Sequence, residues 1–288
     1  MTITDIVGRK GFVVTAELTP PKGVDCAAVL QTAEKMAPLV EAINITDGAS
    51  AVMRMGSLPL CHLLKERGIE PVLQLTCRDR NRIALQSELL NACALGVHNV
   101  LCLTGDHVAL GDHPDARALF DLDSVSLLWA VQRLNSGRDL RGNLLRGAAD
   151  LCAGAAVNPG ASPAEPQLLK MKRKGEAGAR FFQTQAIFEI SGLRPFAAAA
   201  GEMKIPLILG VLVLTTRGGA RFVNEHVSGV RVPEKVAAAM ETSKDPVEAG
   251  VEIAAGLVKE ARKICQGVHL MNAGPEVVRR ILKEAGLK

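Results

Sequence analysis

Two carboxylates stand at the ends of apolar, strand-like runs, where acid–base chemistry could take place. Glu17 follows the run VVTA and precedes a Pro-Pro turn, and Asp106 follows VLCLT and Gly105. A carboxyl group at the end of a buried strand is partly shielded from water, so Glu17 could hold a proton and act as a general acid. A helix cap or a structural ion pair is the alternative for Glu17. Asp106 could lie beside a cofactor or belong to a Gly-Asp turn.

Uncharged polar side chains end or interrupt the other apolar runs in the same way. They are Thr46, Gln74, Thr104, Asn158, Gln183, Gln185 and Asn272. If these runs are strands of one parallel barrel, the polar side chains converge on the rim at the carboxyl ends of the strands. Barrel enzymes place their chemistry at that rim.

A basic segment and a segment rich in His and Asp are the other candidates for binding. The segment LLKMKRKGEAGA (168–179) includes Arg173 and Lys174. A solvated helix face is the usual explanation for such a run, and phosphate binding beside the following strand is the functional one. The segment DHVALGDHPD (106–115) lacks the helical His spacing of zinc proteases, so we expect no metal there and a loop over the rim.

The elements that must position these residues are eight short apolar runs separated by segments of helical spacing. The runs span 12–17, 42–46, 71–76, 99–104, 151–158, 181–186, 206–213 and 267–272. They are almost continuously apolar, as strands buried on both faces of a parallel sheet are. Eight such units predict a (β/α)8 TIM-type barrel forming a single domain over 1–288, since this fold takes roughly 250 residues. The rival fold, an open doubly wound sheet, normally carries Gly-x-Gly-x-x-Gly after its first strand, and that motif is absent there.

Helical spacing predicts the covering helices. They are expected at 26–40, 82–96, 124–135, 164–178, 246–265 and 275–286. In the helix at 82–96 the spacing places Ile83, Leu90 and Ala94 on one face, and in the helix at 124–135 we expect Trp129 to lie inside. The longest irregular segments are expected at 105–120 and 214–232.

Composition limits the classes of function. The net charge of +4, from 34 basic and 30 acidic residues, is too mild to indicate nucleic-acid binding, and aromatic residues make up only 3% of the chain. Seven scattered cysteines with no Cys-x-x-Cys pair indicate reduced thiols and a cytoplasmic protein without its own iron–sulfur cluster. No run approaches the roughly 20 apolar residues of a membrane span, and the first ten residues lack the apolar core of a signal peptide.

Several motifs together resemble the methylenetetrahydrofolate reductase family. They are AELTPPKG, INITDGAS, VLQLTCRDRN, VLCLTGD and LLKMKRKGEAGARFFQTQAIFE, in this order over about 12–190, with GVHLMNAG as the last strand. The most distinctive is the basic helix that leads through Ala-Gly-Ala into a strand with a functional Gln. The resemblance implies a barrel that holds a flavin, FAD or alternatively FMN, at its carboxyl-end rim.

The resemblance also implies roles for individual residues. Glu17 would protonate N10 of 5,10-methylenetetrahydrofolate, and Asp106 would lie between flavin and folate. Gln185 would contact the pterin and Phe222 would stack on the substrate. The flavin contacts would come from Thr46, Gln74, Thr104, Gly105, Asp106, Asn158, Arg173 and Lys174.

The chain departs from the family pattern mainly around the flavin. Gln74 and Asn158 replace two His residues, and Gly154 or Ala155 stands where the family has a Tyr. Gln167 and Lys170 replace an acidic residue and an Asn. The segment 107–150 resembles forms from anaerobic one-carbon pathways, which work with an iron–sulfur partner. Electrons would therefore come from NAD(P)H or from an iron–sulfur or zinc subunit, and we expect an oligomer or a hetero-complex.

Two other functions stay open on the sequence alone. A pterin-binding barrel that transfers a methyl group without redox chemistry could use the same two carboxylates. A barrel subunit that is inactive without its partner would account for the altered flavin contacts. The fold cannot separate these functions, because barrels host many chemistries.

Overall fold

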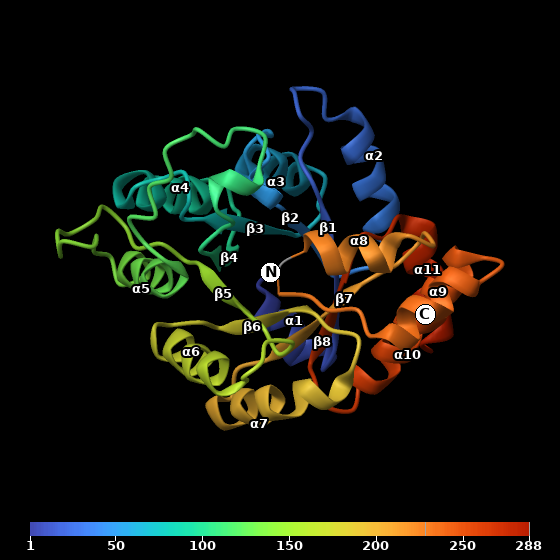
Figure 1. The fold of residues 1–288 in the computed structure, drawn as a ribbon. Coiled ribbons are helices and arrows are strands. Elements are labelled where there is room, and N and C mark those ends of the chain that lie inside the picture. Colours follow the sequence, from blue (N-terminus) through green and yellow to red (C-terminus); the bar gives the residue numbers. More distant parts are fainter. Residues whose placement is uncertain (228, 288) are drawn as a thin grey trace.

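The computed structural model describes residues 1–227 and 229–287, in which eight parallel strands close into a barrel (Figure 1). The strands are β1 Val13–Leu18, β2 Ala42–Ile45, β3 Pro71–Thr76, β4 Asn99–Leu103, β5 Cys152–Val157, β6 Phe181–Ala186, β7 Leu207–Leu212 and β8 Gly267–Met271. They pair in chain order, and β8 pairs with β1 to close the ring. The predicted (β/α)8 barrel is confirmed, and each strand boundary lies within one residue of its predicted position.

Helices surround the strands, as Figure 1 shows. They are α1 Ile3–Lys10, α2 Ala27–Met36, α3 Ser57–Glu66, α4 Arg82–Ala94, α5 Ser124–Asn135, α6 Glu165–Glu176, α7 Arg194–Met203, α8 Gly219–His226, α9 Glu234–Thr242, α10 Pro246–Ala261 and α11 Pro275–Glu284. Short 3-10 turns occur as η1 Ala49–Ala51, η2 Val108–Leu110 and η3 Ile190–Leu193. All six predicted helices form, and α1, α3, α7, α8 and α9 are additional.

The expectation that 214–232 is irregular was wrong over α8. Ala220 and Val223 of this helix pack into a buried cluster with Leu214. The side chain of Asn224 accepts the N–H of Val232 at 2.8 Å and donates to the carbonyl oxygen of the same residue at 3.1 Å. These contacts join residues that are distant in the segment, so local sequence patterns could not reveal them.

The predicted inner face of α4 and the predicted inside position of Trp129 in α5 were also wrong. Ile83 is 74% exposed, and Leu90 and Ala94 are exposed as well. The buried residues of α4 are Leu85, Leu89 and Ala92. Both sets have helical spacing, so spacing alone could not choose between two apolar faces of one helix. In α5, Trp129 is 46% exposed.

Helix α1 closes the amino-terminal end of the barrel. Its buried residues Ile3 and Ile6 pack against Val13 and Phe181 in a separate apolar cluster inside the strands. The N–H of Ile3 donates to the side-chain oxygen of Asn99 at 2.8 Å. Helix α1 thus fills the amino-terminal end of the barrel, so a ligand-binding site is expected at the carboxyl-terminal end.

Above α1, the barrel interior becomes polar. Thr15, Asn44, Gln183 and His269 are all buried. The amide of Asn44 on β2 donates to the amide oxygen of Gln183 on β6 at 3.0 Å, and because these strands are not neighbours the bond crosses the interior. A buried polar layer therefore lies directly beneath the carboxyl-end mouth of the barrel.

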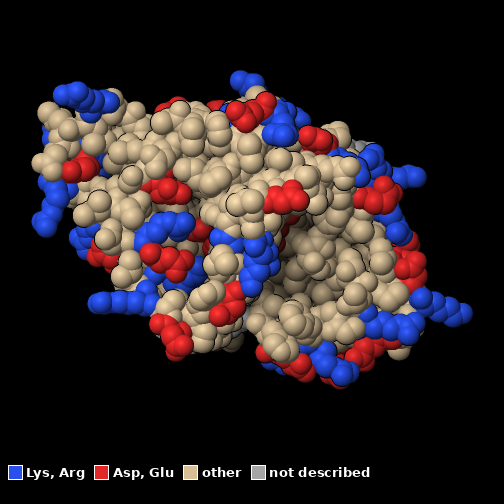
Figure 2. All heavy atoms as spheres, turned by 90° about the horizontal axis from the view of Figure 1, so that it is seen from above, with Lys and Arg blue, Asp and Glu red and all other residues tan. Residues whose placement is uncertain are grey.

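The outer surface carries charges of both signs. In the face shown in Figure 2, basic and acidic side chains are interspersed, with wide areas of uncharged atoms between them.

All seven cysteines are free, and six of them are buried. Among the described residues, no helix is both long enough and apolar enough to cross a membrane.

Candidate active site

A cavity of about 350 Å³ opens at the carboxyl ends of β3 to β6. Seven of the eleven site residues expected from the sequence line it: Gln74, Thr104, Gly105, Asp106, Asn158, Lys174 and Gln185. Gln167 and Lys170 of α6 line it as well. The wall thus combines amide groups with two lysine amines, a set of donors suited to a ligand that carries both ring heteroatoms and negative charge.

Lys174 is the buried cation of this cavity. Its side chain is 6% exposed, and its amine donates to the carbonyl oxygen of Ala156 at 2.5 Å. Burial, and to a smaller extent the charge of the nearby Lys170, lowers the pKa of Lys174 to about 8. The amine forms no ion pair with a carboxylate among the residues that the structure describes, so an anionic ligand would supply the missing countercharge.

Asp106 lies where the loop after β2 meets the end of β4. Its carboxylate accepts the N–H of Ser50 at 3.1 Å. Gly105 before it has φ of +94°, and a Cβ there would lie 3.1 Å from the Cβ of Thr76 and 3.2 Å from that of Arg78. Only glycine fits this close turn, and the exposed Asp106 follows it in the lining of the cavity.

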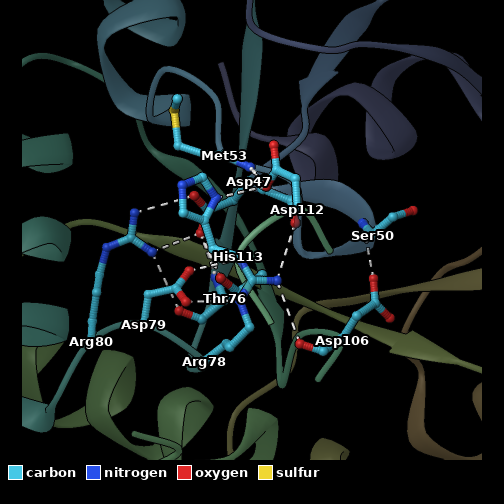
Figure 3. A network of polar contacts seen from close by, with 11 residues as sticks. Asp47, Ser50, Met53, Thr76, Arg78, Asp79, Arg80, Asp106, Asp112 and His113 are labelled. Carbon is cyan, nitrogen blue, oxygen red and sulfur yellow. Dashed lines mark hydrogen bonds and ion pairs between the residues drawn. The ribbon is translucent and has the colours of Figure 1, made fainter. Parts of the chain in front are cut away.

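A buried ion-pair network supports this side of the rim (Figure 3). Asp47 accepts from the hydroxyl of Thr76 at 2.8 Å and from the guanidinium of Arg80 at 2.8 and 3.2 Å. Arg78, only 4% exposed, donates to Asp79 at 2.6 Å and to the carbonyl oxygens of Gly48 and Asp106. The hydrogen bond with Asp79 raises the pKa of Arg78, so Arg78 stays positively charged. The network joins the loops after β2, β3 and β4.

The segment 106–115 connects loops. Asp112 accepts the N–H of Met53 at 2.9 Å, forms an ion pair with Lys22 at 2.6 Å and contacts His113 at 3.0 Å. These bonds hold the pKa of Asp112 well below its usual range, the hydrogen bond from Lys22 having the largest effect. In the described part of the chain no three His, Cys, Asp or Glu side chains are grouped as metal ligands.

Glu17 lies near the end of β1, with its side chain 26% exposed. Its carboxylate is 3.5 Å from Nε2 of His269, which is fully buried on the neighbouring β8. Nδ1 of His269 is 2.8 Å from the hydroxyl of Thr15. The carboxyl group of Glu17 therefore lies at the mouth of the barrel, partly exposed to solvent, with the buried imidazole of His269 beneath it.

Glu17 does not line the cavity of about 350 Å³, and three more of the expected residues do not line it either. Thr46 is buried, and its hydroxyl donates to that of Thr19 at 3.2 Å. Arg173 is exposed on α6. Phe222 is 59% exposed on α8, where its ring stacks on His226 with a centroid separation of 4.7 Å.

The structure accounts for the missing aromatic residue on β5. Gly154 points toward the ring of Phe181, and a Cβ at Gly154 would lie 2.2 Å from that ring. Phe181 is buried in the interior cluster above α1. A tyrosine at this position would need the space that Phe181 already fills.

Two residues of the site were missed in the sequence. Arg78 stands in the charge run CRDRN, which has the composition of an ordinary solvated loop. His269 is one polar residue in the apolar run GVHLMN. Its signal was the alternation of the strand, which places it on the same side as Gly267 and Met271 and therefore inside the barrel.

A closed barrel with a carboxyl group and a polar cavity at the carboxyl ends of its strands has the architecture of a barrel enzyme. The family model described as methylenetetrahydrofolate reductase matches residues 2–286. The chain therefore belongs to the methylenetetrahydrofolate reductase family, which is a family of oxidoreductases, and the family expected from the motifs is confirmed.

Individual relatives agree with this assignment. The chain is 26% identical over 216 residues to the 5,10-methylenetetrahydrofolate reductase of Pectobacterium carotovorum, covering 73% of this chain and 66% of that protein, just under two thirds of its length. It is 25% identical over 255 residues to the enzyme of the same name from Salmonella typhimurium, covering 85% and 80%.

Among solved structures, the chain is similar in fold to an uncharacterized protein from Clostridium thermocellum that binds two copies of 5-methyl-5,6,7,8-tetrahydrofolic acid. The TM-score is 0.62 at 14% identity, with 98% of this chain and 96% of that chain covered. A Mycobacterium tuberculosis tryptophan synthase structure matches with a TM-score of 0.55 at 11% identity. Both likenesses concern the barrel fold.

Proposed function

We propose that this protein reduces 5,10-methylenetetrahydrofolate to 5-methyltetrahydrofolate, with a bound flavin as the redox cofactor. The observation that carries the proposal is the partly exposed carboxyl group of Glu17 at the mouth of a barrel whose rim also holds the cavity lined by amides and lysines. Family membership and the folate bound to the Clostridium protein of the same fold support folate as the substrate.

The residues of the cavity fit a flavin. Gln74 and Asn158 offer amide donors and acceptors for the ring system, and Thr104 and Gly105 complete the wall. Lys174 and Lys170 offer positive charge for phosphate, and the buried Lys174 amine has no carboxylate partner among the described residues. Bound there, a reduced flavin would supply the hydride. We take FAD as the cofactor, with FMN as the alternative that mass identification would distinguish.

Glu17 is the proton donor in this proposal. Its carboxylic acid gives a proton to N10 of the folate, the bond from N10 to the bridging carbon breaks, and the N5 electron pair forms an iminium with that carbon. Hydride addition to the carbon then yields the N5-methyl group. Because its side chain is 26% exposed, Glu17 can regain a proton from solvent after each turnover.

Asp106 and Gln185 serve the folate side of the cavity. The Asp106 carboxylate is held by the N–H of Ser50, and a fixed negative charge there stabilises the positive charge that develops on N5. Gln185 ends the interior face of β6 and is exposed to the mouth, where its amide can pair with the pterin. Phe222, exposed on α8, is the residue that would stack on the substrate in this proposal.

The test uses purified protein whose flavin has been reduced chemically under anaerobic conditions. Addition of methylenetetrahydrofolate is expected to yield one 5-methyltetrahydrofolate per flavin, identified by mass spectrometry. Chemical reduction makes the result independent of whether NAD(P)H or an iron–sulfur or zinc partner subunit supplies electrons in the cell. Protein without flavin, or methyl transfer to an added acceptor without oxidation of the flavin, would contradict the proposal.

A further inference from the structure

We propose that His269 is a positioning residue that holds the carboxyl group of Glu17 for proton transfer, with Thr15 fixing the orientation of its imidazole. The inference rests on the proposed function, since it concerns the same acid. It arises from a buried group for which the fold gives no other use: an imidazole inside the barrel, directly beneath the mouth.

His269 is placed where only a specific partner can satisfy it. Its side chain is fully buried, and its Nε2 has no hydrogen-bond partner among the described residues. The nearest carboxylate oxygen is that of Glu17, at 3.5 Å. A buried N–H without a hydrogen-bond partner destabilises the folded state, so an apolar side chain would fill this space at a lower cost in free energy.

Thr15 determines which nitrogen carries the proton. Its hydroxyl is 2.8 Å from Nδ1 of His269, and 3.5 Å from the carbonyl oxygen of Val268. The shorter contact favours donation from the hydroxyl to Nδ1, which leaves the proton of the neutral ring on Nε2. We therefore assign the tautomer whose N–H is directed at Glu17. Thr15 and His269 are register partners on β1 and β8, so barrel closure itself aligns them.

The remaining gap between Nε2 and Glu17 is suited to a carboxyl group that moves. Glu17 is partly exposed and His269 is rigidly buried, so a small rotation of the Glu17 side chain can close the 3.5 Å separation to hydrogen-bond length. A hydrogen bond to a carboxylate is stronger than one to a neutral acid. His269 thus stabilises Glu17 most strongly after the proton has left, and it limits the directions in which the acid can point.

The experiment compares His269→Leu with His269→Gln in flavin-loaded protein. Leucine removes the donor, whereas the glutamine amide can place an N–H near the position of Nε2. We expect kcat for methylenetetrahydrofolate to fall about tenfold in His269→Leu, with KM within about twofold and flavin content retained. Glutamine should restore most of the lost kcat. In a Glu17→Gln background, His269→Leu should have no further effect, because the two residues act as one unit.

The matched control is Ile208→Val, a truncation in the apolar interior cluster near α1. It is expected to lower thermal stability without changing kcat. If His269→Leu does not fold, Thr15→Val decides the matter: a loss of kcat of about threefold at unchanged KM supports the proposal, and an unchanged kcat overturns it.

Two results separate this inference from the proposed function. If the wild-type protein does not reduce methylenetetrahydrofolate, the proposed function is wrong and His269 has no acid to position. If the wild-type protein is active but His269→Leu keeps full kcat, or loses activity that glutamine does not restore and that persists in the Glu17→Gln background, the positioning role of His269 is wrong.

Discussion

The charge of Lys174 makes the affinity of the cavity for an anionic ligand depend on pH. Burial and the neighbouring Lys170 lower the pKa of Lys174 to about 8, so the amine is protonated in neutral solution and becomes neutral as the pH rises further. An anionic ligand favours the protonated form, so binding takes up a proton at pH values above the pKa of the free protein. The affinity for such a ligand therefore depends on the state of this one side chain.

This linkage predicts how flavin binding responds to pH. The Kd for flavin should be nearly constant below pH 8 and should rise above it, by at most about tenfold per pH unit. Lys174→Met should remove most of the rise and weaken binding at neutral pH, whereas Lys172→Met, an exposed neighbour on α6, should keep the wild-type profile. Titration of the apoprotein by fluorescence quenching measures both. A flat profile in the wild-type protein would show that Lys174 does not contact the anionic part of the ligand.

At the residue scale, most of the cavity could be predicted from the sequence and one contact could not. Gln74 lies near the carboxyl end of β3, and Asp106 and Asn158 follow β4 and β5. Parallel strands bring their carboxyl ends together in any barrel. His269 lies close to Glu17 only because β8 pairs with β1 in one particular register. That register cannot be predicted from the sequence. A lone histidine within an apolar strand otherwise has the pattern of a core residue.

At the scale of elements, the rim depends on loops that are tied together by side chains. Asp112 in the loop after β4 binds the N–H of Met53 in the loop after β2 and the amine of Lys22 in the loop after β1. A single carboxylate thus connects three loops around the mouth. The segment has no regular structure of its own beyond η2, so these ties determine its position.

Removing this tie should loosen the rim and leave the barrel intact. In Asp112→Ala we expect faster amide hydrogen exchange over 48–56 and 107–119, a KM for the folate raised several-fold, and an unchanged midpoint of thermal unfolding. Asp115→Ala, an exposed aspartate in the same loop, serves as the control. Unchanged exchange in the Asp112 variant would mean that the loops are held by other contacts.

Helix faces were the least predictable part of the elements. In α4 two sets of apolar residues share helical spacing, and the structure buries Leu85 and Leu89 while Ile83 is exposed. The choice depends on which face the neighbouring strands and helices cover, a tertiary property. Strands were predicted accurately because both of their faces are buried, so their apolar runs need no choice of side.

For the whole molecule, barrel closure makes the two ends of the chain depend on each other. β1 pairs with both β2 and β8, and α1 fills the amino-terminal end of the same barrel. No subset of the strands can form the closed sheet without the others. We propose on this ground that the chain is a single folding unit.

This proposal predicts one cooperative unfolding transition. Circular dichroism should report the loss of the whole barrel, and the fluorescence of Trp129, the one tryptophan in the sequence, should report unfolding around α5. The two transitions should coincide in temperature and in denaturant. A transition of the tryptophan signal that clearly precedes the loss of helix and strand would show that part of the chain folds independently.

In the proposed reaction, Glu17 delivers the proton that opens the folate ring for reduction. The most direct test of this step is the rate at which methylenetetrahydrofolate reoxidises the chemically reduced flavin, followed by visible absorbance in wild-type and Glu17→Gln protein. Glutamine keeps the size of the side chain and removes the acid, so we predict unchanged flavin content and a rate lower by about 10²- to 10⁴-fold. Reoxidation of the Glu17→Gln protein at the wild-type rate would show that Glu17 is not the proton donor.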